Sequence, residues 1–203
     1  MKYHSYKIHT LSWDEVLYGY SIGIFPMGDT DGSIGWYESS PRAILPIELP
    51  TSKIHIPRSL SQVLKKDLFQ LRIDTQFENV IRLCGARDST WINELIIDAY
   101  MDLFRRGYAH SIETWLDNKL VGGLYGVGYM GAFFGESMFR TIDNASKFAV
   151  VKLYEILKKN NYLLFDIQMM TPLFETLGAI NITKKDYQDI LERAMKVARK
   201  FKY

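Results

Sequence analysis

The chain has 203 residues, of which 47% are hydrophobic and 24% are charged, and its formal net charge is +2. This length suits one medium domain or a small domain joined to a larger one, and the weak charge does not by itself indicate nucleic acid binding. The single cysteine, Cys84, excludes an internal disulfide framework and a cysteine-rich metal site, which fits a reducing compartment.

Residues 1–60 are predicted to form a small, irregular N-terminal lobe. Ser12 and Glu15 have the spacing of a capping box, in which both side chains satisfy free backbone N–H groups, so a short helix is expected there. Glycine and aspartate between Phe25 and Gly35 indicate a loop. Prolines then separate two short predicted strands, ILPIEL (44–49) and KIHI (53–56).

Residues 61–203 are predicted to form the larger domain. Apolar residues at helical spacing predict helices that begin near Ser59 and that cover Phe77–Leu83 and Trp91–Arg105. A short strand is expected at Leu71–Asp74.

A different pattern follows, with three predicted strands over His110–Trp115, Leu120–Val127 and Ala132–Phe139. Because their connections are short, they are expected to form an antiparallel meander. A helix capped by Asn144 comes next, and then a strand over Leu163–Gln168 that is fully apolar up to Asp166.

The last elements are a short helix over Leu173–Leu177 and a final helix that begins at Thr183. The resulting order predicts an α/β (α+β) fold of the acyltransferase kind, with an antiparallel meander and flanking helices. The N-terminus lacks the apolar core of a signal peptide, and no apolar run is long enough to span a membrane, so a cytoplasmic protein is expected.

One acidic residue, Glu136, ends an uncharged, glycine-rich run that begins at Leu120. It is either a substrate ligand or an ordinary strand-end acid that reaches water. The glycines of the run weaken strands, and their recurrence indicates that a ligand or another backbone comes close.

Two polar residues, Asp166 and Gln168, end the buried strand LLFDIQ and, as residues i and i+2, face the same side. They are either part of a ligand site, which α/β proteins tend to place at strand ends, or a polar pair satisfied by the local backbone.

A basic edge is formed by Arg58, Lys65 and Lys66. It is either a solvated helix face or a surface that contacts phosphates. The four histidines have no metal-ligand spacing, so no metal site is expected.

Linked motifs over roughly residues 11–190 resemble the leucyl/phenylalanyl-tRNA–protein transferases, and they occur in that family's order. The matching segments are Gly19-Tyr-Ser-Ile-Gly-Ile-Phe-Pro26, Ser40-Pro-Arg42, Thr90-Trp-Ile92, Ala99-Tyr100, Gly107-Tyr-Ala-His-Ser-Ile-Glu113, Leu120-Val-Gly-Gly-Leu-Tyr-Gly126, Gly135-Glu-Ser-Met-Phe139, Asn144-Ala-Ser-Lys147, Asp166-Ile-Gln168 and Leu177-Gly-Ala179.

The resemblance implies a GNAT-like C-terminal domain and transfer of Leu or Phe, with Met as a third candidate, from aminoacyl-tRNA. The acceptor would be the N-terminal amine of a protein that begins with Arg or Lys, which is thereby marked for degradation by the N-degron pathway. An aminoacyl ester is already activated, so no cofactor or metal is implied.

The resemblance also assigns roles by position. Asp166 and Gln168 would be the catalytic pair, with Asp166 polarising and orienting Gln168, and alanine at either position is expected to cut transfer while the fold stays intact. Glu136 would hold the α-amino group of the aminoacyl ester, which suits a carboxylate in apolar surroundings.

Further residues match the family's binding surfaces. The side-chain pocket would be lined by residues whose alternative role is plain core packing: Leu124, Phe133, Val150, Leu153 and Phe165. The aminoacyl-adenosine site would include Trp91 and Tyr100, with Tyr37 stacking on adenine, and the acceptor stem would contact Arg58, Lys65 and Lys66.

Two other functions remain open. A GNAT-like acetyltransferase would need a pyrophosphate-binding loop before the main helix, which the sequence from Thr141 to Ser146 does not supply. A non-catalytic adaptor on the same scaffold would bind tRNA without forming product, and it would have no need of Asp166 with Gln168.

Overall fold

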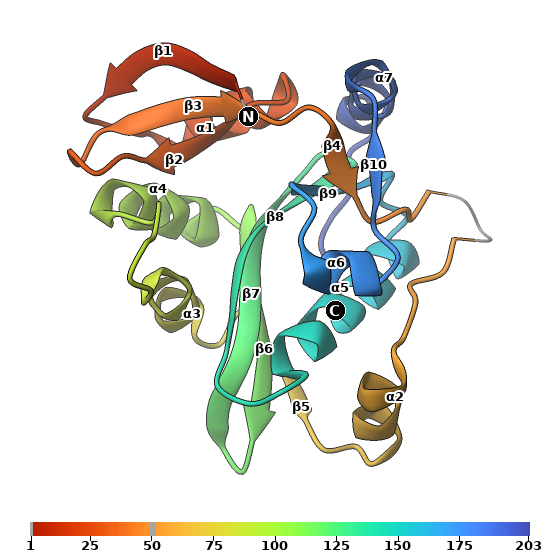
Figure 1. Ribbon diagram of the computed structural model, residues 1–203. Helices are drawn as coiled ribbons and strands as arrows, with labels where there is room; N and C mark the ends of the chain where they lie inside the picture. The colour runs from red at the N-terminus through yellow and green to blue at the C-terminus, as the bar shows by residue number, and fades with distance from the viewer. Residues whose placement is uncertain (1, 49–51) are drawn as a thin grey trace.

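The computed structural model describes residues 2–48 and 52–203 and contains two β-sheets (Figure 1). The smaller sheet has three antiparallel strands in the order β1-β3-β2, formed by β1 (Lys2–Ile8), β2 (Phe25–Gly28) and β3 (Ile34–Glu38). Helix α1 (Trp13–Ser21) lies between β1 and β2 in the chain. The predicted capping box is confirmed, since the Ser12 N–H donates to the Glu15 carboxylate at 2.8 Å.

The prediction of a loop between Phe25 and Gly35 is wrong, because β2 and the start of β3 occupy most of this segment and pair as a hairpin. Its turn residues belong only to the short connection, where Gly32 has φ +82°, a left-handed conformation that glycine adopts without strain. The composition of a five-residue turn therefore masked the two strands beside it.

The larger sheet has seven strands in the order β10-β4-β9-β8-β7-β6-β5. All neighbours are antiparallel except β8 and β9, which are parallel. The strands are β4 (Arg42–Ile44), β5 (Gln70–Ile73), β6 (Ala109–Leu116), β7 (Lys119–Tyr129), β8 (Ala132–Arg140), β9 (Leu164–Gln168) and β10 (Ile180–Ile182). The predicted antiparallel meander is confirmed as β6, β7 and β8.

Helices cover both faces of this sheet (Figure 1). They are α2 (Arg58–Lys65), α3 (Phe77–Gly85), α4 (Glu94–Arg105), α5 (Ala145–Lys159), α6 (Pro172–Thr176) and α7 (Lys184–Met195). Adjacent residues of β8 serve the two faces: Phe133 packs in the core with α5, and Phe134 packs in the core with α3 and α4. The predicted mixed α/β architecture is thus confirmed.

The boundary between the two sheets lies between Glu38 and Arg42, ahead of residue 60. Strand β4, from the predicted N-terminal lobe, pairs with β9 in the large sheet. The KIHI segment forms no strand, and Leu49, the last residue of ILPIEL, lies outside the described residues. We propose that the N-terminal lobe ends between β3 and β4.

Two helix starts differ from the prediction. Helix α4 begins at Glu94 rather than Trp91, because the Asn93 side chain accepts from the Ile96 N–H at 3.1 Å and caps it there. Trp91 is consequently left in the preceding loop. Asn144 precedes α5 in a left-handed conformation, with φ +68°, and its side chain makes no capping hydrogen bond.

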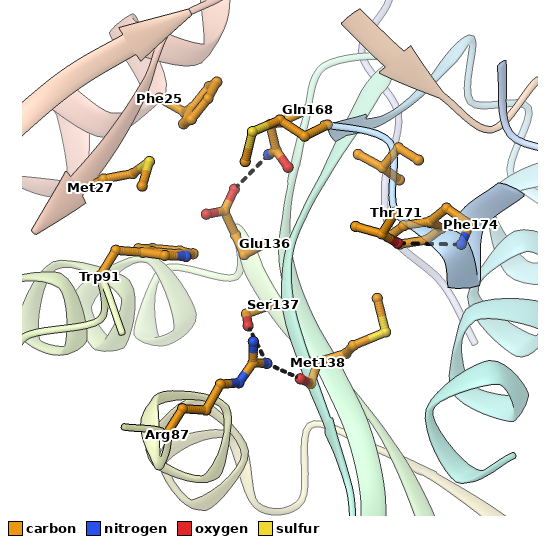
Figure 2. Close-up of a pocket in the computed structure, with 12 residues that line it drawn as sticks. Phe25, Met27, Arg87, Trp91, Glu136, Ser137, Met138, Gln168, Thr171 and Phe174 are labelled. Atoms are coloured by element: carbon orange, nitrogen blue, oxygen red, sulfur yellow. Dashed lines mark hydrogen bonds between the residues drawn. The ribbon is translucent and has the colours of Figure 1, made fainter. Parts of the chain in front are cut away.

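The parallel strands β8 and β9 separate along their length. They pair only where Ala132–Phe134 lie beside Leu164–Asp166. Past these residues each strand continues without the other, and this gap holds Glu136 on one side and Gln168 on the other (Figure 2).

The glycines of β7 make room for protein atoms. A Cβ atom added at Gly126 would lie 2.4 Å from the Phe134 carbonyl oxygen and 2.5 Å from the Phe133 ring. At Gly122 it would lie 2.6 Å from the Cβ of Ala145, at the start of α5. At Gly122 and Gly126, the groups that come close to the glycine are therefore other atoms of the protein and not a ligand. Gly135, in contrast, lines a pocket.

Candidate active site

A cavity of about 230 Å³ opens in the gap between β8 and β9 (Figure 2). Its lining comes from both strands, from β2, from α6 and from the loop before α4. The residues are Phe25, Met27, Arg87, Trp91, Glu136, Ser137, Met138, Ile167, Gln168, Met169, Thr171 and Phe174. The carboxyl ends of parallel strands are where α/β proteins tend to bind ligands.

Glu136 lies at the centre of a hydrogen-bond cluster. Its Oε1 accepts from the Tyr20 hydroxyl at 2.6 Å and from the Gln168 amide at 3.1 Å, and its Oε2 accepts from the Tyr100 hydroxyl at 3.1 Å. Tyr20 and Tyr100 also hydrogen-bond to each other. Burial raises the pKa of Glu136 to about 7, against the opposing effect of the two tyrosine hydroxyls. The carboxylate is thus held in place, and a cationic ligand would stabilise its charged form.

Asp166 is fully buried and forms a bidentate ion pair with Arg42, which is 1% exposed. The Asp166 carboxylate accepts from Arg42 Nε at 2.9 Å and Nη2 at 2.6 Å, and from the Tyr187 hydroxyl at 2.7 Å. Burial opposes the charge of Arg42, but Asp166, Tyr187 and Glu136 together outweigh it and raise the pKa of the guanidinium. Arg42 Nη1 donates to the Gly23 carbonyl at 3.1 Å, which connects this pair to the N-terminal lobe.

Asp166 reaches Gln168 through the backbone. The Gln168 N–H donates to Asp166 Oδ1 at 2.9 Å, whereas the Gln168 side chain bonds to Glu136. Gln168 has φ +56°, a left-handed conformation that is uncommon for a residue with a side chain. The resemblance implied that Asp166 polarises the side-chain amide of Gln168. In the structure the Asp166 carboxylate bonds to the backbone N–H of Gln168 and not to that amide. Asp166 instead fixes the backbone turn that presents the amide.

The predicted pocket residues fall into two groups. Leu124 and Phe165 line a smaller cavity of about 30 Å³ next to Glu136. Phe133, Val150 and Leu153 are fully buried in the core behind it. A cavity known to bind benzene measures roughly 150 Å³, so the smaller cavity by itself has too little space for a phenylalanine side chain.

The predicted adenosine-site residues are also divided. Trp91 lines the larger cavity, and the Gly28 N–H donates to its carbonyl at 2.9 Å, which ties it to β2. Tyr100 bonds to Glu136. Tyr37 lines neither cavity, and its hydroxyl donates to Asp29 at 3.0 Å. Met27, from the neighbouring strand β2, lines the larger cavity near Trp91, where Tyr37 was expected (Figure 2).

The basic edge is exposed on and just after α2, with Arg58 at its start and Lys65 at its end, followed by Lys66. Figure 1 shows α2 beside α5, away from the small sheet. No three His, Cys, Asp or Glu side chains come together to hold a metal ion within residues 2–48 and 52–203. Nor does any helix in that part of the chain have the length and apolarity to cross a membrane.

The sequence patterns did not indicate Arg42, Tyr20 and Tyr187 as site residues. Arg42 and Tyr20 stand within motifs that match the family, but their roles depend on partners more than 100 residues away in the chain. A buried arginine is rare unless it is paired, and that pairing is visible only once β4 lies beside β9.

The comparisons with known proteins agree over almost the whole chain. Residues 48–192 match the family model described as leucyl/phenylalanyl-tRNA protein transferase, and residues 9–40 match the model of that family's N-terminal domain. A leucyl/phenylalanyl-tRNA–protein transferase of Herpetosiphon aurantiacus is 42% identical over 94% of this chain and 98% of its own. One of Rubrobacter xylanophilus is 44% identical over 90% of this chain and 94% of its own.

A solved structure of an aminoglycoside acetyltransferase from an uncultured soil metagenomic sample covers 64% of this chain and 89% of its own, with 12% identity and a TM-score of 0.40. That degree of likeness carries no argument about substrate. The family-model match and the relatives define an enzyme of the aminoacyltransferase class. The chain belongs to the leucyl/phenylalanyl-tRNA protein transferase family.

Proposed function

We propose that the protein transfers Leu or Phe, with Met as a third candidate, from aminoacyl-tRNA to the N-terminal α-amine of proteins that begin with Arg or Lys. The single observation that supports it best is the Glu136 carboxylate, held by Tyr20 and Tyr100 beside the apolar pocket of Leu124 and Phe165. A leucyl or phenylalanyl ester carries an ammonium group next to an apolar side chain, so it matches both features.

In the proposed reaction the neutral amine of the acceptor attacks the ester carbonyl carbon. The resulting tetrahedral intermediate loses the ribose oxygen, which takes up the proton that the amine gives up, and a peptide bond forms. An N-terminal amine has a pKa of about 7.7–8.0, so a useful fraction is neutral near pH 7. Glu136 would hold the donor's ammonium, and positioning of this kind can supply about 7–11 kcal/mol of the barrier.

Gln168 would orient the attacking amine. A neutral amide is a very weak base, so proton abstraction by it is a poor explanation. Its carbonyl oxygen is the group that can accept from the amine, because its Nε2 donates to Glu136. The Gln168 amide would then align the attacking amine with Glu136, which holds the donor's ammonium group.

For Gln168→Ala we expect about a 100-fold lower rate of transfer, which is the scale of loss for a misplaced reactant. Gln168→Gly is the matched control, because glycine relieves the left-handed backbone while it also lacks the amide. Both variants should lose transfer alike in single-turnover assays. Full activity in Gln168→Gly would contradict the orienting role.

The reaction assay uses labelled Phe-tRNA with two peptides that differ only in their first residue, Arg or Met. We expect label in the Arg-starting peptide and little in the Met-starting one. Transfer to neither peptide would refute the proposed function. Binding of tRNA without any product would support the adaptor instead.

The acetyltransferase alternative is tested by saturable binding of coenzyme A, which we expect to be absent. In the segment before α5, the Ala145 N–H already donates to the Ile142 carbonyl at 3.2 Å, which supports the absence of a pyrophosphate loop. We further propose that no cofactor is needed, since the ester is activated. We propose the cytoplasm as its compartment, and degradation through the N-degron pathway as the fate of the acceptor.

A further inference from the structure

Arg87 stands at the mouth of the cavity, two residues past the end of α3. The residue is exposed, yet its side chain is held against β8, where Nη2 donates to Ser137 Oγ at 3.2 Å and to the Met138 carbonyl (Figure 2). Ser137 and Met138 directly follow Glu136. The guanidinium, bonded to β8, and the Glu136 carboxylate, carried by β8, therefore border the same cavity.

The partners of Arg87 are neutral oxygens. In the described parts of the chain no carboxylate forms an ion pair with it, whereas Arg82, five residues earlier, pairs with both Glu78 and Glu94. A guanidinium carries five N–H donors, and the two bonds to β8 both use Nη2. A fixed cation with unused donors at a cavity mouth is suited to an anionic ligand.

We propose that Arg87 binds the phosphodiester that joins the terminal adenosine of aminoacyl-tRNA to the preceding nucleotide, an inference that rests on the function proposed above. The cavity offers a carboxylate to one part of its ligand and a guanidinium to another. The donor has both charges, an ammonium on its amino acid and phosphodiesters on its RNA. An acceptor that begins with Arg or Lys is cationic, and Arg87 would repel it.

The chemistry of arginine fits this ligand. Its planar guanidinium can give two parallel hydrogen bonds to phosphate oxygens, which a lysine cannot do. Trp91 lines the same cavity and can stack on a base or a ribose face. Arg87, Trp91 and Glu136 would then contact the phosphate, the nucleoside and the amino acid of one ligand.

A structural role for Arg87 predicts something different. If Arg87 only ties the loop after α3 to β8, its loss should weaken the binding of every donor substrate equally. The test therefore compares Phe-tRNA with 3′-O-phenylalanyl-adenosine, which lacks the phosphate. The variant is Arg87→Gln, which keeps a donor for the Met138 carbonyl, and the matched control is Arg82→Gln on the surface of α3.

With Phe-tRNA we expect Arg87→Gln to raise KM about 10- to 100-fold, the range for hydrogen bonds to charged groups. With phenylalanyl-adenosine, KM should stay within about twofold of the wild-type value. The slope of log Kd for Phe-tRNA against log salt concentration should decrease by about 0.7, as expected for one lost phosphate contact on a single strand. Arg82→Gln should leave all three measurements unchanged.

Equal losses with both donors in Arg87→Gln, or an unchanged salt slope in that variant, would overturn the role of Arg87 and leave the proposed function standing. Failure of the wild-type protein to use Phe-tRNA would instead refute the function. If Arg87→Gln folds poorly, Arg87→Lys gives the same comparison of the two donors, and equal losses with both would again overturn the role. It keeps the charge and hence the salt slope, and it should raise KM for Phe-tRNA alone.

Discussion

Asp166→Ala is expected to lower the free energy of unfolding by about 3–5 kcal/mol and to remove most transfer activity. The alanine would leave the Arg42 guanidinium buried without its counter-ion, and breaking a buried ion pair from one side has this cost. The backbone turn at Gln168 would also lose its acceptor. Urea unfolding at pH 7, combined with the transfer assay, measures both effects.

The matched control is a double variant, Arg42→Met with Asp166→Leu, in which both charges are replaced by apolar groups. It should recover most of the stability, because no unpaired charge remains, but it should not recover transfer. Unchanged stability of Asp166→Ala would contradict the structural importance of the pair. From the sequence alone, Asp166→Ala was expected to leave the fold intact. The structure changes this expectation to a destabilised protein, because the sequence did not reveal that Asp166 pairs with Arg42.

Glu136→Gln is expected to reduce kcat/KM for Phe-tRNA about 10- to 100-fold, mainly through KM. The variant keeps the size of the side chain but cannot hold an ammonium group by charge, and a hydrogen bond to a charged group is worth about 1.5–3 kcal/mol. Initial rates at several Phe-tRNA concentrations measure it. An unchanged KM would contradict the amine-binding role of Glu136.

The pH dependence of Phe-tRNA binding gives an independent test. The pKa of Glu136 is about 7, so its charged fraction grows as the pH rises from 6 to 8. Binding should strengthen over the first part of this range and weaken once the donor's amine loses its proton. In Glu136→Gln the rising part should vanish, because that side chain does not titrate.

The same pKa predicts a stability difference. Burial raises the pKa of Glu136 above its value of 4.5 in the unfolded chain, so the folded state binds the proton more tightly. Between about pH 4.5 and 7 its contribution to the free energy of unfolding must therefore fall as pH rises. As the pH rises from about 4.5 to about 7, the wild-type protein should lose stability relative to Glu136→Gln. Urea unfolding of both proteins at these two pH values measures the difference.

Most of the regular structure followed from local pattern. Helical spacing of apolar residues located α3 and the body of α4, and short glycine or Asp-Asn connections predicted the meander of β6, β7 and β8. Such features depend on neighbouring residues in the chain, which is why they are readable. The β2–β3 hairpin was missed because its strands are short and its turn composition dominates the window.

The site was predictable only in part. Asp166 and Gln168 were found because polar residues at the end of an apolar strand are unusual, and Glu136 because it interrupts a long uncharged run in the middle of β8. Trp91 was found through a family motif. The three residues that complete their hydrogen bonding, Tyr20, Arg42 and Tyr187, were not found. Arg87 was not found either, since an exposed arginine after a helix is unremarkable in sequence.

By itself the sequence determined the family, the strands that carry Glu136, Asp166 and Gln168, and the absence of a cysteine framework. The tertiary structure alone decided how those groups are connected. It showed that the parallel strands β8 and β9 separate beyond their short ladder, that Asp166 is neutralised by Arg42 and that Gln168 bonds to Glu136. The physical reason is range: helical periodicity and short hairpin connections depend on neighbours in the chain, whereas the pairing of buried charges depends on residues that only folding brings together.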